Sequence, residues 1–190
     1  MGRTRGWTGR MLGGRLVALV ALAGLVPFSA AAQEAGEDGA PTVIYLVRHA
    51  ERATDHPSDP TLSPQGEARA MELARLLADA PLDRVFSTDF RRTRLTAAPV
   101  TDRHGLSVEV YDPRGEGLQA FAGLLRTTPG HLLVVGHSNT TPELVQALGG
   151  DPVSPIGEME YDRIYLVVVD RQGRVTSTLL RFGEGYTPEG

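Results

Sequence analysis

The sequence contains no cysteine and no lysine, and all 19 of its basic residues are arginine. Without thiols this chain offers no disulfide, no cysteine nucleophile and no zinc site built on thiolates. Without lysine it offers neither a Walker-type phosphate loop nor Schiff-base chemistry, because both need a lysine amine. Its 23 acidic residues outnumber the arginines and give a net charge of −4. That balance argues against nucleic acid as a partner.

The sequence also lacks an apolar run of the roughly 20 residues that a membrane-spanning helix needs. A shorter apolar run covers residues 16–28, and small residues follow it up to Ala32. Four arginines precede the run: Arg3, Arg5, Arg10 and Arg15. This order is typical of a secretory signal peptide over residues 1–32. An uncleaved N-terminal anchor is the alternative.

Cleavage after Ala32 would leave 158 residues, with 15 arginines against 23 acidic residues and a net charge of −8. We therefore expect an extracytoplasmic protein, periplasmic or secreted, without stable membrane association after cleavage. Residues 33–41 are rich in Glu, Gly and Ala and are predicted to be a flexible leader. Residues 42–182 contain no second linker and are predicted to form one domain, followed by a flexible tail over residues 183–190.

Within this domain, strand and helix patterns alternate along the chain. Strands are predicted at 43–47, 84–86, 107–110 and 132–135, helices at 63–78, 89–104, 118–125 and 141–148, and a hairpin at 163–169 and 175–181. Ser63 before Pro64 is predicted to cap the first helix, and Asp89 to cap the second. The alternation predicts an α/β fold: a three-layer α/β/α sandwich whose central sheet is mostly parallel, with an antiparallel C-terminal edge hairpin.

Histidines and arginines follow several of these predicted strands. Arg48 and His49 come directly after the first strand, Arg92 lies just beyond the second, and His137 comes after the fourth. Ligands bind beyond the carboxyl ends of the strands in such sheets, so we expect these side chains to meet there. The planar guanidinium fork matches phosphate oxygens, and imidazole is the natural nucleophile in a chain without cysteine or lysine. The sequence therefore predicts a site for a phosphoryl group.

Four segments carry a family resemblance, with order and spacing preserved from about Val43 to Leu148. They are Leu46-Val47-Arg48-His49-Ala50-Glu51, Leu62-Ser63 with Gly66, Phe86-Ser87-Thr88-Asp89-Phe90-Arg91-Arg92-Thr93 with Thr96-Ala97, and Val134-Val135-Gly136-His137. Together they resemble the signature segments of the histidine phosphatase (phosphoglycerate mutase-like) superfamily, and the short chain is similar to its small phosphohistidine-phosphatase-like branch.

The resemblance implies roles for individual residues. His49 would be the nucleophile that becomes phosphohistidine, and Arg48, Arg92 and His137 would form the phosphate pocket. Asn139 would either contact phosphate or cap the turn after the second histidine. Three other arginines are predicted to be mainly solvent-exposed, namely Arg52, which could alternatively extend the pocket, Arg91 and Arg94.

The proton donor of the family has no certain match in this chain. Asp112 is the best candidate because it stands at the end of the third strand, although an Asp before a proline also starts turns. Glu116, Glu51 and Glu143 are alternatives; Glu51 could instead orient an arginine. A fifth possibility is that no dedicated acid exists, as the small phosphohistidine-phosphatase-like members of the superfamily suggest.

These expectations combine into one functional hypothesis. The chain is predicted to be an exported, metal-independent phosphatase that acts on phosphomonoesters of a small molecule or a phosphoprotein through a phosphohistidine on His49, without a cofactor. Two alternatives are a phosphoglycerate-mutase-type phosphoryl transferase and a catalytically inactive protein that binds phosphate esters.

Overall fold

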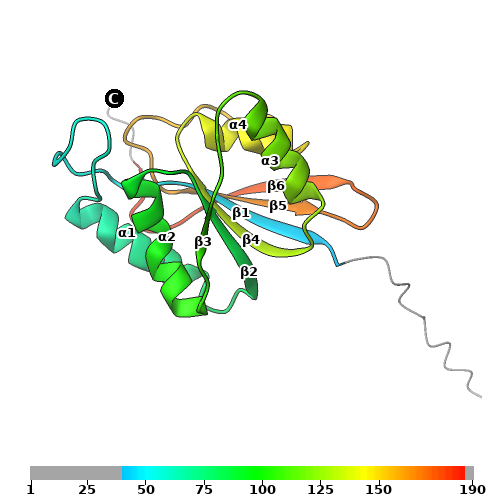
Figure 1. Cartoon of the computed structure of the whole chain (residues 1–190), viewed down its shortest axis with the longest axis horizontal. Helices are drawn as coiled ribbons and strands as arrows, with labels where there is room; N and C mark the ends of the chain where they lie inside the picture. Colours follow the sequence, from blue (N-terminus) through cyan, green and yellow to red (C-terminus); the bar gives the residue numbers. More distant parts are fainter. Residues whose placement is uncertain (1–39, 187–190) are drawn as a thin grey trace, which may run out of the picture. The chain divides into compact units, whose positions relative to one another are not determined.

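The structure is a computed structural model that describes residues 40–186 (Figure 1). The described part contains four helices and one sheet of six strands. In chain order the elements are β1 (Thr42–Arg48), α1 (Pro64–Leu76), β2 (Leu82–Ser87), α2 (Arg91–His104), β3 (Val108–Val110), α3 (Glu116–Arg126), β4 (Gly130–Gly136), α4 (Thr140–Ala147), β5 (Arg163–Val169) and β6 (Val175–Arg181). The predicted element order is confirmed.

The sheet has the strand order β3-β2-β4-β1-β5-β6. The four strands β3, β2, β4 and β1 are parallel to one another, whereas β5 runs antiparallel to β1 and β6 antiparallel to β5. This confirms the mostly parallel sheet with an antiparallel C-terminal hairpin. Because β1 and β4 are adjacent and in register to Arg48 and Gly136, the chain leaves both strands at the same edge of the sheet.

Helices cover both faces of the sheet, as the three-layer prediction requires (Figure 1). On one face, α1 and α2 bury Leu73 and Val100 against Val85 of β2 and Val135 of β4. On the other face, α3 and α4 bury apolar side chains against the alternate residues of the same strands, among them Phe86 of β2 and Val134 of β4. The central strands are thus apolar on both sides, and their polar residues collect where the strands end.

The start of α1 lies against the segment that follows β1. Ser63 caps the helix, as predicted, by accepting a hydrogen bond from the Gly66 amide at 3.1 Å. A Cβ at Gly66 would stand 2.2 Å from the carbonyl oxygen of Glu51. Only glycine therefore allows this close approach, which fixes α1 beside the residues that continue from Arg48 and His49.

The predicted cap of α2 is wrong. The helix begins at Arg91, and Asp89 makes no capping bond; its carboxylate pairs with Arg94 instead. Asp59 supplies the missing acceptor, because its Oδ1 takes a hydrogen bond from the Arg91 amide at 2.9 Å. The loop before α1 thus reaches the start of α2, a contact across 32 residues that no local pattern encodes.

Part of the predicted C-terminal tail is bonded to the domain. The carbonyl of Glu184 accepts a bond from Arg69, and the Tyr186 amide donates to Asp162 at 3.1 Å, so residues 183–186 do not form the free tail that composition suggested. The predicted signal peptide, residues 33–39 of the leader and residues 187–190 lie outside the described residues. Among the helices within residues 40–186, none has both the length and the apolar character needed to cross a membrane.

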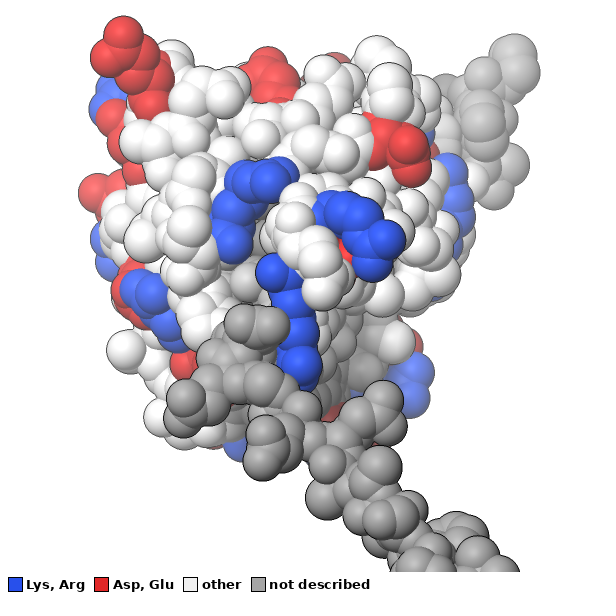
Figure 2. Space-filling view, turned by 90° about the vertical axis from the view of Figure 1, so that its right-hand side faces the viewer, with Lys and Arg blue, Asp and Glu red and all other residues white. Residues whose placement is uncertain are grey.

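Charged side chains are distributed over the surface as well as at strand ends. Figure 2 views the molecule from the end where β1 begins and where the β5–β6 turn lies, and arginines gather near the middle of that end. Acidic groups lie mainly towards its margins (Figure 2). Arginine is therefore not confined to the candidate site, and the site has to be identified from geometry rather than from charge alone.

Candidate active site

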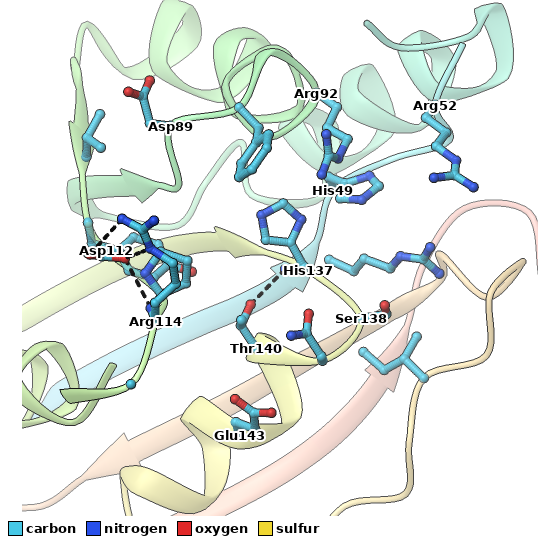
Figure 3. A pocket seen from close by; sticks show the side chains of 18 of the residues that line it. His49, Arg52, Asp89, Arg92, Asp112, Arg114, His137, Ser138, Thr140 and Glu143 are labelled. Atoms are coloured by element: carbon cyan, nitrogen blue, oxygen red, sulfur yellow. Dashed lines mark hydrogen bonds and ion pairs between the residues drawn. The ribbon is translucent and has the colours of Figure 1, made fainter. Parts of the chain in front are cut away.

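A pocket of about 1160 Å³ lies beyond the carboxyl ends of the parallel strands (Figure 3). Its walls come from the segments that follow β1, β2, β3 and β4, and from Ile156 and Glu158 before β5. All six residues predicted for the site line it: Arg48, His49, Arg92, Asp112, His137 and Asn139. The topology therefore brings together residues that are up to 91 positions apart in the sequence.

His49 is buried, and its ring is held in a single tautomer. Its Nδ1 lies 2.7 Å from the carbonyl oxygen of Ala50. A carbonyl can only accept, so Nδ1 carries the hydrogen and Nε2 keeps its lone pair. Burial lowers the pKa of His49 to about 3, and the nearby charges of Arg48, His137 and Arg92 act in the same direction. The ring is neutral at pH 7, as a nucleophile must be.

His137 faces His49 across the pocket. The two rings meet edge to face, with their centroids 5.4 Å apart, and the Phe90 ring lies 5.1 Å from His137 on another side. The Nε2 of His137 lies 2.9 Å from the hydroxyl of Thr88, and the His137 amide donates to the hydroxyl of Thr140 at 3.1 Å. Burial lowers the pKa of His137 to about 4, aided by the two arginines. Both ends of this histidine are thus positioned by threonines.

Arg48 is held by the turn before β5. Its Nη1 donates to the carbonyl oxygens of Gly157 and Glu160 at 2.8 and 2.9 Å, and its guanidinium stacks 4.0 Å from the centre of the Tyr161 ring. The Nε of Arg48 is buried and has no hydrogen-bond partner within residues 40–186. An orphaned buried donor is costly, so this geometry fits an anion that would accept from it.

Arg92 supplies a second cation to the same space. Its guanidinium lies 4.4 Å from the centre of the Phe90 ring, and its side chain is only 15% exposed. The carboxylate of Asp59 is 3.8 Å away, so the ion pair is loose. Figure 3 shows Arg92, His49 and His137 converging on one region of the pocket. Desolvation lowers the pKa of Arg92, which means that an anionic ligand would stabilise its charged form.

The structure bears on two residues for which the sequence left alternatives, Asn139 and Arg52. Asn139 stands before α4 but makes no capping bond with its side chain, and it lines the pocket. Its geometry therefore fits the alternative of a ligand contact. Arg52 also lines the pocket, but it is half-exposed and paired with Glu158 at 3.0 Å. It belongs to the rim, and part of its charge is already neutralised.

Asp112 lies in the pocket wall, yet its surroundings argue against a proton donor. Arg114 donates to both of its carboxylate oxygens, at 2.8 and 3.1 Å (Figure 3). These bonds lower the pKa of Asp112, so the carboxyl carries no proton at neutral pH. Its Oδ1 also accepts from the Arg114 amide at 3.1 Å, which is the turn geometry expected of an Asp before a proline.

The alternative acids are placed no better. Glu51 is buried and accepts two bonds from Nε of Arg69, at 2.9 and 3.0 Å, so it orients an arginine. Glu116 is exposed and does not line the pocket. Glu143 lines it from the first turn of α4, where it is exposed and lies away from His49 (Figure 3). No group of three His, Cys, Asp or Glu within residues 40–186 has a geometry that would hold a metal ion.

Sequence reasoning missed two sets of residues that complete the site. Thr88 lies inside a segment already identified, and its hydroxyl could have been suspected there. Glu160 and Tyr161 follow the last predicted helix, in a stretch without periodicity or motif. Nothing in the local sequence indicates that this stretch returns to Arg48, a contact spanning more than a hundred residues.

Fold and pocket together define an α/β protein that presents two neutral imidazoles and two arginines at the carboxyl edge of its sheet. Comparisons with known proteins agree with that description. The family described as "Histidine phosphatase superfamily (branch 1)" matches residues 44–116. The probable phosphoglycerate mutase GpmB of Escherichia fergusonii is 32% identical over 151 residues, which cover 76% of this chain and 66% of that protein. GpmB of Erwinia tasmaniensis is 38% identical over 77 residues, or 37% of this chain and 35% of that protein.

Solved structures show the same fold. The protein histidine phosphatase SixA complexed with tungstate superposes with a TM-score of 0.62 at 23% identity, covering 73% of this chain and 96% of that one. A mycobacterial glucosyl-3-phosphoglycerate phosphatase superposes with a TM-score of 0.56 at 15% identity, covering 74% and 98%. The chain belongs to the histidine phosphatase superfamily. It spans about one third to two thirds of the length of the GpmB proteins named above.

Proposed function

We propose that the protein is a phosphatase that hydrolyses phosphorylated substrates through a phosphohistidine intermediate on His49. One observation carries the proposal: the Ala50 carbonyl holds Nδ1–H of His49 and leaves the neutral Nε2 available in a pocket lined by Arg48, Arg92 and His137. A nucleophile with its lone pair free and an anion site around it are the two parts that phosphoryl transfer needs.

In the first step, the Nε2 lone pair of His49 attacks phosphorus and the bond from phosphorus to the leaving oxygen breaks, with its electron pair going to that oxygen. Arg48 and Arg92 stabilise the charge on the equatorial oxygens. The Thr88 hydroxyl donates to Oγ1 of Thr93 at 3.0 Å, so towards His137 its oxygen accepts from Nε2–H. Nδ1 of His137 can then donate to a phosphate oxygen once the ring is protonated. In the second step, water attacks phosphorus, the P–N bond breaks, and its electrons return to Nε2. The attacking water loses a proton to the solvent, and this balances the proton that the leaving oxide takes from the solvent.

The lack of a proton on Asp112 bears on the substrate class. An alkoxide leaves poorly without protonation, whereas an aryl oxide or an imidazole leaves readily. We therefore infer a preference for phosphorylated groups with good leaving atoms. The shared fold with a protein named as a protein histidine phosphatase supports a phosphorylated substrate, small or protein-borne.

A phosphoglycerate-mutase-type transferase is the second candidate, supported by the likeness to GpmB. A mutase must hold a second phosphate while the first is transferred. Two further arginines line this pocket, but Arg52 is paired with Glu158 and Arg114 with Asp112. With both arginines already neutralised, the pocket favours hydrolysis over retention of a bisphosphate.

Trapping the intermediate tests the mechanism. After a rapid quench without acid, a labelled phosphoester should leave phosphate on His49 that is labile to acid and stable to base. His49→Ala should abolish both label and turnover, and Arg92→Ala should lower turnover by about 10²–10³. Near-normal turnover in His49→Ala would exclude the mechanism. Phosphate binding by the wild type without any turnover would favour the inactive binding protein instead.

We further propose that the protein is exported, on the basis of its first 32 residues. Mass spectrometry of the protein from its native host should find a mature start at Gln33. A product that retains residues 1–28 would instead indicate an anchor or retention in the cytosol.

A further inference from the structure

A buried carboxylate, that of Glu160, lies behind the candidate phosphate pocket in the turn before β5. The side chain of Glu160 is only 5% exposed and does not line the pocket. Its Oε1 accepts from Nε of Arg163 at 2.6 Å and from Nη1 of Arg181 at 3.0 Å. Its Oε2 accepts from the amide of Gly157 at 3.0 Å. A carboxylate so buried and so fully bonded is fixed in space.

These bonds define a tight turn over residues 157–160, which we call the 157–160 turn. The Glu160 amide donates back to the Gly157 carbonyl at 3.1 Å, so the turn is closed twice, once through the backbone and once through the Glu160 carboxylate. The carbonyls of Gly157 and Glu160 are the two acceptors of Nη1 of Arg48. The position of the arginine therefore depends on the geometry of this turn.

The orientation of Arg48 matters because Nη1 is fully used by the turn. Its buried Nε and its Nη2 have no hydrogen-bond partner among the described residues, and they are the donors left for an anion. Stacking on Tyr161 restricts tilting of the guanidinium plane but allows sliding, whereas two carbonyls on one nitrogen fix its direction. A shift in the 157–160 turn would thus move the phosphate donor.

We propose that Glu160 is a positioning residue that, by clamping the 157–160 turn, aims the Arg48 guanidinium at the bound phosphoryl group. Arg163 and Arg181 supply the positive charges that hold the Glu160 carboxylate in place. The antiparallel β5–β6 hairpin therefore takes part in building the phosphate pocket. This inference rests on the proposed function, because it takes the pocket to be a phosphate site.

The sharpest variant is Glu160→Asp. It keeps the negative charge, and the long side chains of Arg163 and Arg181 can follow the shortened carboxylate by changing rotamer. The Gly157 amide is part of the backbone and cannot follow. Glu160→Asp should therefore fold, keep its ion pairs and lose the clamp. Glu160→Gln removes the charge as well and serves as the stronger perturbation.

Asp162→Asn is the matched control. Asp162 is 1% exposed and accepts from the same Nη1 of Arg181 at 2.6 Å, but its other oxygen bonds the Tyr186 amide rather than the 157–160 turn. The two carboxylates therefore share burial and an ion-pair partner and differ in the clamp.

The experiment measures the dissociation constant of inorganic phosphate for the full chain by calorimetry, together with KM and kcat for an aryl phosphate. Glu160→Asp should weaken phosphate binding by roughly 10-fold and raise KM accordingly, while Asp162→Asn stays within about 2-fold of the wild type. In an Arg48→Ala background, Glu160→Asp should have no further effect on phosphate affinity, because a positioning residue acts only through the group it positions.

Each alternative result has a distinct meaning. Unchanged phosphate affinity in Glu160→Asp, an equal loss in Asp162→Asn, or additive losses in the double variant with Arg48→Ala would each overturn the clamp while leaving the proposed function intact. A wild type that binds no phosphate would overturn the proposed function, and the clamp with it.

Discussion

Nδ1 of His49 lies 2.7 Å from the carbonyl oxygen of its own neighbour, Ala50. The contact fixes the tautomer through the backbone, so no side chain is needed to prepare the ring. The same hydrogen bond raises the pKa of His49, because it stabilises the protonated ring, and so it opposes the effect of burial on that pKa. Burial is the larger effect, and the ring stays neutral with Nε2 available. Local backbone geometry at the end of β1 therefore determines which nitrogen can react.

Two buried neutral histidines predict how stability depends on pH. His49 and His137 have pKa values of about 3 and 4 in the folded protein, against 6.5 for an ordinary histidine. Between pH 6.5 and about 4, both are therefore neutral when folded and protonated when unfolded. The unfolded state binds more protons, so stability falls as the pH falls. Each ring contributes about 1.4 kcal/mol per pH unit in that window.

Urea unfolding at a series of pH values, without phosphate, measures this dependence. In His137→Gln the slope between pH 6.5 and 4 should be smaller than in the wild type by about 1.4 kcal/mol per unit. Carboxylates that titrate in the same range are common to both proteins and cancel in the comparison. Identical slopes would show that His137 is not held neutral in the fold.

Much of this site was predictable because strand ends are visible in a sequence. Arg48 and His49 end a continuous apolar run, His137 ends another, and parallel strands bring such ends together. The bounds of β5 and β6 also agree with the prediction, since both have β-strand patterns around a clear turn. Local sequence patterns were sufficient to predict the structure wherever neighbouring residues determine it.

Contacts between distant segments account for what was missed. Asp89 has the position and chemistry of a helix cap, but Asp59 from another loop fills that role. Glu160 and Tyr161 meet Arg48 only because β5 pairs with β1 and returns the preceding turn to the end of β1. The position of Asp112 after β3 predicts a proton donor, whereas its protonation state depends on Arg114, two residues further on.

Thr88 should support catalysis through His137. Its hydroxyl, 2.9 Å from Nε2 of His137, fixes which ring nitrogen faces the ligand. Thr88→Val keeps the shape but removes that hydrogen bond and the one that Thr88 donates to Thr93, and kcat/KM should fall by about 10-fold. Thr88→Ser should restore most of the rate. The nitrogen chemical shifts of the His137 ring report the tautomer directly, and a rate loss without any change in those shifts would assign Thr88 a structural role only.

Asp59 and Asp89 offer a paired test of the helix α2 start. Asp59→Ala removes the acceptor of the Arg91 amide and should lower the free energy of unfolding by about 1 kcal/mol. Asp89→Ala removes only an exposed ion pair with Arg94 and should stay within about 0.5 kcal/mol of the wild type. Urea unfolding at neutral pH measures both, and equal losses would contradict the long-range cap.

The last prediction concerns the leaving group. Arg114 lowers the pKa of Asp112, so at neutral pH Asp112 has no proton to give. The wild type should therefore hydrolyse nitrophenyl phosphate faster than an alkyl phosphate by a factor of about 10² or more, since general acid catalysis is worth about 10²–10⁴ and the alkyl ester lacks it here. Steady-state rates of the two substrates at saturating concentration give this ratio.

Asp112→Asn decides whether that preference arises from the missing acid. If Asp112 takes no part in proton transfer, the variant should change both rates by a similar and small factor and leave their ratio intact. If Asp112 is the donor, the alkyl phosphate alone should slow sharply, and the high-pH limb of its rate profile should disappear. Arg114→Gln is a check in the other direction, because it frees the Asp112 carboxyl and should raise its pKa. Hydrolysis of the alkyl phosphate should then become faster only if Asp112 is the proton donor. Glu143→Gln, in the first turn of α4, should leave the ratio of the two rates unchanged. A melting curve of each variant separates unfolding from an effect on the chemistry.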